Sequence, residues 1–268
     1  MSRAHTRLDV CDGYATLTLA RPEIRNALTD ETMLTEIVDA VTSPGADVLV
    51  ITGDGPAFSA GGNVNHMAER TGMFSGSPSE IGEAYRRTIQ TLTRAMATTD
   101  TVTIAAVNGP AVGAGFDLAL GCDLRIGSSS CWFAHTFTDL GIIPGDGGAW
   151  LLPRVVGWQR AAEISLTARR VEAAEARELD ILLEVVTPED LLARSAALAR
   201  EIAAKPTHSI RYTKRLLRYA HRMDLDGFLE LSAALQALSH QEPSHEVAVR
   251  AYLEEWRSRR PRGSAGDE

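Results

Sequence analysis

The chain has 268 residues, of which 44% are hydrophobic and 23% charged, and its formal net charge at pH 7 is −8. This composition supports one large domain or a domain with an appendage, and a negative charge without a long basic run argues against a nucleic-acid partner. No apolar run approaches the ~20 residues that a membrane-spanning helix needs, so we expect no membrane association.

The amino-terminal half alternates predicted strands and helices. Alternating apolar and polar residues at 14–20 predict a half-buried strand, and Thr29 or Asp30 can cap a helix that runs to about residue 42. The apolar run at 47–52 is typical of a strand covered on both faces. A mobile loop at 70–79 should then lead into one helix at about 80–97.

The same pattern continues before the chain becomes helical. We expect a strand at 101–107, a helix at 114–120, a strand at 123–126 and another helix after residue 144. From about residue 187 onward almost every pattern is helical, and residues 257–268 look like a frayed tail. The order predicts an α/β core over 1–200 and an all-helical region over 201–268.

Two short runs of small residues follow predicted strands. Residues 58–62 read F-S-A-G-G, and residues 112–116 read V-G-A-G-F. Such glycines can cradle a phosphate, but the usual phosphate-loop patterns are absent, or they can serve tight turns and close helix packing. A third hypothesis is that each run donates one backbone N–H to a single oxygen atom, which would form an oxyanion hole.

Longer motifs around these runs resemble a known family. Residues 58–67 (F-S-A-G-G-N-V-N-H-M), 105–126 (A-A-V-N-G-P-A-V-G-A-G-F-D-L-A-L-G-C-D-L-R-I) and 141–157 (G-I-I-P-G-D-G-G-A-W-L-L-P-R-V-V-G) are similar, in order and spacing, to three signatures of the crotonase superfamily. This is also called the enoyl-CoA hydratase/isomerase family. Residues 21–28 (R-P-E-I-R-N-A-L) resemble its first turn, and the resemblance covers roughly residues 8–258.

The resemblance implies a fold and a substrate class. The fold would be a crotonase-type spiral of ββα units with a C-terminal all-helical region that serves oligomerisation, as a homotrimer or hexamer, and helps to close the pocket. The substrate would be an acyl-CoA thioester. Coenzyme A would enter as part of the substrate, and neither a metal nor a separate cofactor is expected.

Five positions take binding roles by this resemblance. The backbone N–H groups of Gly62 and Ala114 would form the oxyanion hole and stabilise an enolate. Ala60 and Val64 would line the channel for adenine and pantetheine, although core packing explains both residues equally well. Arg25 would lie near the coenzyme A phosphates, unless it is only a solvated turn residue.

The acid/base groups depart from the family pattern. Asp117 occupies the position of the first catalytic glutamate, one methylene shorter, with the capping of a loop as the alternative. Phe137 replaces the second glutamate and would instead line the acyl pocket. A later slot that holds an aspartate in other members is Gly145 here. Ordinary hydration by two carboxylates is therefore in doubt.

Four nearby side chains are substitutes for the missing acid. Asp146 lies one residue beyond the late slot, and we expect it to cap the helix that follows. Asp139 would lie on the same side as Phe137 in an extended segment, or be solvated. His66 and His135 can titrate near neutrality, and His135 is the better placed of the two.

These features predict an enzyme of acyl-CoA enolate chemistry, either an enoyl-CoA hydratase or an isomerase, with the missing glutamate favouring isomerisation. The alternative is a non-catalytic acyl-CoA-binding or scaffolding homologue that has lost its second acid. The start of the chain lacks the apolar stretch of a secretion signal, and its three cysteines have no paired spacing. We therefore expect a cytoplasmic location.

Overall fold

The computed structural model describes residues 3–258 and divides the chain into two compact units, with the boundary between Ala203 and Ala204. The first unit contains both β-sheets. The described part of the second unit consists of helices α10 (Thr207–Tyr219), α11 (Leu225–Gln241) and α12 (Pro243–Ser258). Residues 259–268, most of the expected tail, lie outside the described residues.

The main sheet has six strands in the order β1-β2-β3-β4-β6-β9. Strand β1 is antiparallel to β2, and every other neighbouring pair is parallel. Parallel strands covered on both faces need apolar residues at successive positions, and β3 and β4 have them. The strands are β1 (Thr6–Cys11), β2 (Tyr14–Leu19), β3 (Val48–Gly53), β4 (Val102–Val107), β6 (Leu124–Ser128) and β9 (Glu184–Val186).

A smaller sheet joins β5 (Ala111–Val112), β7 (Trp132–Ala134) and β8 (Arg170–Glu172), in that order. Strand β5 runs parallel to β7, and β7 runs antiparallel to β8. A single parallel bridge between Ser59 and Ala111 ties the chain that follows β3 to β5. This bridge brings together two segments that are about fifty residues apart in the sequence.

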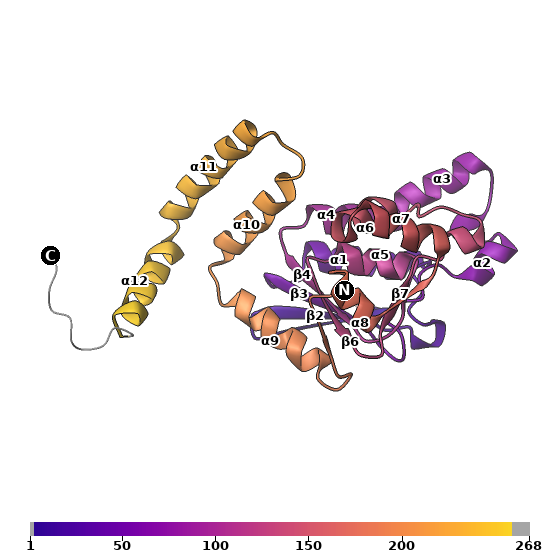
Figure 1. Ribbon diagram of the computed structural model, residues 1–268, viewed down its shortest axis with the longest axis horizontal. Helices are drawn as coiled ribbons and strands as arrows, with labels where there is room; N and C mark the ends of the chain where they lie inside the picture. The colour runs from indigo at the N-terminus through magenta and orange to yellow at the C-terminus, as the bar shows by residue number, and fades with distance from the viewer. Residues whose placement is uncertain (1–2, 259–268) are drawn as a thin grey trace. The chain divides into compact units, whose positions relative to one another are not determined.

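Helices cover both faces of the main sheet. Helix α9 (Leu191–Ala203) packs on strands β2, β3, β4 and β6. Helices α1 (Glu31–Thr42), α4 (Ile89–Thr98) and α5 (Ala114–Gly121) pack against one another on the other side of the strands, as Figure 1 shows. The mixed α/β core and the helical carboxyl-terminal region confirm the predicted fold class. Among residues 3–258, no helix combines the length and hydropathy required to cross a bilayer.

The long helix expected at 80–97 is in fact two helices. Helix α3 (Pro78–Arg87) begins at a capping box formed by Ser77 and Glu80, and it ends at Thr88, whose φ is −113° and ψ is −99°. The Thr88 hydroxyl donates a hydrogen bond to the Ala84 carbonyl at 2.6 Å, which gives that end of the helix a side-chain partner. The apolar periodicity continues through the break between the two helices, so the sequence pattern gave no sign of the break.

The remaining elements are short. The expected mobile loop contains a 3-10 turn and the first residues of α3. The remaining short elements of the first unit are η1 (Pro22–Ile24), α2 (Val64–Glu69), η2 (Gly72–Phe74), η3 (Thr138–Leu140), α6 (Gly148–Val156), α7 (Trp158–Thr167) and α8 (Ala173–Glu178).

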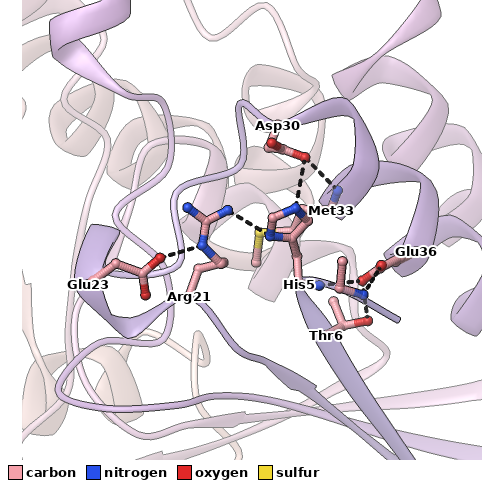
Figure 2. Close-up of polar contacts among 8 residues, drawn as sticks. His5, Thr6, Arg21, Glu23, Asp30, Met33 and Glu36 are labelled. Carbon is pink, nitrogen blue, oxygen red and sulfur yellow. Dashed lines mark hydrogen bonds and ion pairs between the residues drawn. The ribbon is translucent and has the colours of Figure 1, made fainter. Parts of the chain in front are cut away.

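A polar cluster fixes the turn that leads into α1 (Figure 2). Glu36 accepts hydrogen bonds from the backbone N–H groups of Ala4 and His5 and from the Thr6 hydroxyl, at 2.6, 3.1 and 2.9 Å. Burial opposes the ionised form of Glu36, but these donors hold its pKa below the ordinary value. Asp30 caps α1 by accepting from the Met33 N–H at 3.0 Å, as the sequence predicted.

Candidate active site

The two small-residue runs lie side by side. The Val112 N–H donates to the Ser59 carbonyl at 2.9 Å. A Cβ atom on Gly61, whose φ is +74°, would lie 2.3 Å from the Val112 oxygen, and one on Gly115 would lie 2.3 Å from the Ser59 oxygen. Such distances exclude any side chain, so these glycines are required by the close approach of the two backbones.

Both predicted backbone donors reach one cavity. Gly62 and Ala114 line a cavity of about 320 Å³ in the first unit. Ala114 is the first residue of α5, so its N–H has no partner in the helix ladder, and the positive end of the helix dipole lies there. Across residues 3–258, neither the Gly62 nor the Ala114 N–H donates a hydrogen bond to another protein group.

The wall of this cavity is mainly apolar and partly aromatic. It includes three residues that the sequence predicted there: Ala60, Val64 and Phe137. The sequence did not point to the other apolar residues of the wall, since each looks like an ordinary core residue in its own pattern. They include Leu28, Met67, Met73, Phe74, Tyr85, Ile89, Leu140 and Ile142.

Arg25 is not part of the cavity wall. It is exposed, with a φ of +52° at the end of η1, and its carbonyl accepts a hydrogen bond from the Ala60 N–H at 2.9 Å. The next residue, Asn26, donates to the Ala57 carbonyl at 3.0 Å, and its own carbonyl accepts from the Ser59 hydroxyl at 2.8 Å. The turn therefore fixes the first small-residue run through its backbone.

The positions of the carboxyl groups differ from the sequence prediction, which assigned the catalytic role to Asp117. Asp146 and Asp139 are among the residues that line the cavity and Asp117 is not, although Asp117 and Asp146 are both almost fully buried, with 5% and 4% of their surfaces exposed. Asp117 and Asp146 lie close enough for each carboxyl to shift the pKa of the other. Of this pair, Asp146 is therefore the member that belongs to the cavity wall.

His135 completes the buried group. Its Nε2 lies 3.2 Å from Asp117 Oδ1, and its Nδ1 lies 2.8 Å from the Ser165 hydroxyl. The Phe137 ring packs edge-on against the imidazole, with ring centroids 4.8 Å apart. Gly148 leaves room for the pair, because a Cβ there would lie 2.1 Å from Asp117 Oδ1 and 2.4 Å from His135 Nε2.

The expectation that Asp146 caps the next helix is wrong. Helix α6 begins after Gly147, which has a φ of +116°, and no side chain caps it. The Asp146 carboxyl instead meets that of Asp117, and the Thr93 hydroxyl holds the Asp146 backbone by donating to its carbonyl. The contact with Asp117 joins residues that are far apart in the sequence, whereas the expected cap was inferred only from the residues next to Asp146.

Burial sets the charge of this group. Burial, followed by the neighbouring Asp117, raises the pKa of Asp146 to about 9. Burial also raises the pKa of Asp117 to about 7, although hydrogen bonds with Asp146 and the Gly148 N–H oppose this, and burial lowers the pKa of His135 to about 4. Near neutrality the imidazole is uncharged, and between about pH 7 and 9 the two carboxyls together hold about one proton.

The other predicted substitutes differ in position. Asp139 lies in η3 on the cavity wall, whereas His66 lies in α2, outside the wall. Ser165, on α7, was not identified from the sequence, because an isolated serine in a helix gives no signal. Within residues 3–258, no three His, Cys, Asp or Glu side chains group as ligands for a metal ion.

The α/β core has an apolar cavity with two unpaired amides at its wall and a buried carboxyl pair beside them. This combination is typical of enzymes that stabilise an oxyanion while moving a proton. The family model for enoyl-CoA hydratase/isomerase matches residues 10–259. The chain therefore belongs to the enoyl-CoA hydratase/isomerase family, as its motifs predicted.

Individual relatives cover almost the whole chain. It is 35% identical to 1,2-epoxyphenylacetyl-CoA isomerase of Escherichia coli over 90% of this chain and 92% of the relative. It is 34% identical to crotonyl-CoA hydratase of Syntrophomonas wolfei, over 90% and 91%. A solved enoyl-CoA hydratase from Bacillus anthracis superposes with a TM-score of 0.86 at 27% identity, covering 94% of this chain and 97% of that one.

Proposed function

We propose that the protein catalyses proton transfer on acyl-CoA thioesters through an enolate bound by the backbone N–H groups of Gly62 and Ala114. The observation that carries this proposal is that Asp146 and the residues of both unpaired amides, Gly62 and Ala114, line the same cavity. A thioester oxygen between the two amides would bring the adjacent carbon atoms of the acyl group toward the carboxyl. Family membership and the names of the relatives support an acyl-CoA substrate.

The two amides would act on the charge that develops during the reaction. When a proton leaves the α-carbon, negative charge moves from that carbon to the thioester oxygen. Donors already fixed by the packing of two backbones need no reorganisation to stabilise this charge, and one such donor typically contributes ~3–4 kcal/mol. The N-terminal end of α5 adds a favourable potential at Ala114.

Asp146 is the acid/base group in this proposal, in place of Asp117. It belongs to the residues that line the cavity, whereas Asp117 does not. As a carboxylate, Asp146 would take a proton from one carbon of the enolate system, and as the acid it would return the proton to another carbon. Asp117 would accept or release the proton that the pair shares.

This arrangement favours isomerisation of an unsaturated acyl-CoA over hydration. Addition of water requires one group to orient the water and another to protonate the α-carbon. The second family position is Phe137, whose ring lines the cavity and cannot exchange a proton. Moving a double bond requires only one group that removes and then returns a proton.

The cavity wall indicates the kind of acyl group. Phe74, Tyr85 and Phe137 lie among aliphatic and methionine side chains. Aromatic side chains contact planar groups through edge and face interactions, and methionine adapts to irregular shapes. We therefore propose a hydrophobic acyl group that carries a ring or conjugated double bonds.

The remaining expectations also enter as proposals. Coenzyme A would be part of the substrate, with no separate cofactor. Leu225, Leu229, Val247 and Tyr252 on α11 and α12 are each more than half exposed in the single chain. Large apolar side chains gathered on two helices are typical of surfaces that become buried on association, so we propose a homotrimer or hexamer. The proposed location is the cytoplasm.

Exchange of α-protons tests this function directly. The full-length protein would be incubated in D₂O with phenylacetyl-CoA, crotonyl-CoA or a 3-enoyl-CoA, and deuterium uptake followed by NMR. We expect uptake at the α-carbon or migration of the double bond, and its loss in Asp146→Asn. Tight binding of all three compounds without exchange would instead support the non-catalytic alternative.

A further inference from the structure

We propose that His135, itself held by Ser165, is a positioning residue that keeps Asp117 ionised and leaves the shared proton on Asp146, the member of the pair that lines the cavity. The resting site would then present a neutral carboxylic acid to the acyl group. The inference rests on the proposed function only for what this acid does to a substrate. The location of the proton is a property of the protein alone.

The number of hydrogen-bond donors differs between the two carboxyls. Asp117 Oδ1 lies 3.2 Å from His135 Nε2, and the Gly148 backbone N–H lowers the pKa of Asp117, so two groups besides Asp146 favour its charged form. Among residues 3–258, the one hydrogen-bond donor that lowers the pKa of Asp146 is its own backbone N–H. Donors stabilise the charged form of a carboxyl, so Asp117 is the better place for the negative charge.

The state of His135 follows from its two contacts. A neutral imidazole carries one N–H and one acceptor nitrogen. If the Ser165 hydroxyl donates to Nδ1, then Nε2 carries the hydrogen and donates it to Asp117. The opposite tautomer would need a proton on Asp117 to fill the His135 contact, which would leave an ionised Asp146 beside it without a donor between the carboxyls.

Two buried oxygens mark the position of the shared proton. Asp117 Oδ2 and Asp146 Oδ1 are buried, and neither receives a hydrogen bond from any N–H or O–H group of the described chain. Unpaired buried carboxyl oxygens are costly, whereas one proton on Asp146 that is donated to Asp117 satisfies both. Two ionised carboxylates at this position would repel each other in a poorly solvated site.

Other titratable groups near the pair leave this assignment unchanged. The Tyr85 phenol on α3 senses the Asp146 charge, and burial together with that charge raises the pKa of Tyr85, so the phenol stays neutral. The imidazole is neutral as well, because burial lowers the pKa of His135 to about 4. Between about pH 7 and 9 the pair therefore has one negative charge, and the donors of Asp117 determine which member carries it.

Carbon-13 NMR on the full-length protein with labelled aspartate carboxyls tests the location of the proton without any substrate. The signal lost in Asp146→Asn should have the chemical shift of a protonated acid at pH 7.5. The signal lost in Asp117→Asn should have that of a carboxylate. The reverse assignment, or two ionised carboxyls, would overturn the proposal whether or not the protein is an enzyme.

Matched variants separate positioning from simple packing. His135→Leu removes the donor to Asp117, whereas His135→Gln retains an N–H of similar reach. In His135→Leu, Asp117 should bind a second proton more readily, and its titration should move upward by about one pH unit, with little change in His135→Gln. Ser165→Ala should give a smaller upward shift, and Ser165→Thr should restore the wild-type titration.

The outcomes also separate this inference from the proposed function. Normal titrations without α-proton exchange would sink the enzyme proposal and retain the positioning role. Exchange activity with identical titrations in wild type and His135→Leu would support the enzyme proposal and overturn the positioning role of His135. If His135→Leu fails to fold, the wild-type chemical shifts and the Ser165→Ala and Ser165→Thr pair still decide the question.

Discussion

The cavity has two walls of different origin. One is made of backbone, where the run that ends at Gly62 lies against the run that ends at Ala114. The other is made of side chains, where Asp146 lines the cavity and is backed by the buried side chains of Asp117 and His135, which come from two further segments. The first wall has glycines because no side chain fits between the two chains, with a Gly61 Cβ only 2.3 Å from the Val112 oxygen.

The difference shows how the site divides its chemistry. Backbone donors stabilise any oxyanion and are indifferent to the reaction that produced it. The carboxyl wall determines where a proton goes, so the reaction type depends on it. Perturbing one wall at a time should therefore give separable effects, on charge stabilisation at one wall and on proton transfer at the other.

The largest effect is expected at Asp146. Removing a group that transfers a proton typically costs 10²–10⁴-fold in rate, so Asp146→Asn should reduce α-proton exchange by about 10³-fold with little change in acyl-CoA affinity. Asp139→Asn is the matched control, because Asp139 also lines the cavity but lies outside the buried pair. Its exchange rate should fall less than about tenfold, and an equal loss in both variants would contradict the role of Asp146.

The backbone wall should respond in stability. Gly61→Ala introduces a Cβ into backbone atoms at a φ of +74°, and overpacking together with backbone strain should cost about 2–4 kcal/mol in unfolding free energy. Gly141→Ala is the control, because its φ is +68° but no atom lies within 4 Å of the added Cβ. Urea unfolding that gives the same loss for both variants would show that the close approach of the runs is unimportant.

The carboxyl wall should make stability depend on pH. The folded pKa of Asp146, about 9, lies above the ordinary value of 3.8, so the folded chain binds a proton that the unfolded chain releases. Stability from this group is complete below pH ~4 and falls as pH rises, by up to ~1.4 kcal/mol per unit between pH 7 and 9. Asp146→Asn should flatten this slope in unfolding experiments, and an unchanged slope would count against a buried, protonated Asp146.

The smallest effect is expected at Arg25, which belongs to neither wall. Its side chain is exposed, so Arg25→Ala should weaken acyl-CoA binding by no more than about fivefold, with the difference reduced at high salt. Arg70→Ala is a suitable control, because Arg70 is exposed at a similar left-handed position at the end of α2. A loss of catalytic rate in Arg25→Ala at saturating substrate would indicate that the turn affects the donors as well.

The sequence predicted the backbone wall, and it named Asp117, Asp146 and His135 as candidates without predicting how they meet at the carboxyl wall. Glycine runs after apolar strands are local patterns, and so is the strand at Tyr14–Leu19. The contact between Asp117 and Asp146 spans residues far apart in the chain, and nothing local to Asp146 distinguishes it from a helix cap. Strands β5, β7 and β8 have only two or three residues, too few to show alternation, and β1 was missed because most of its residues are exposed.

A crystal structure with a non-reactive acyl-CoA analogue tests the central claim most directly. We predict that the thioester oxygen lies about 3 Å from the amide nitrogens of residues 62 and 114, with the α-carbon next to the Asp146 carboxyl. An oxygen bound elsewhere in the cavity, or an α-carbon that faces Phe137 with no carboxyl in reach, would contradict the account.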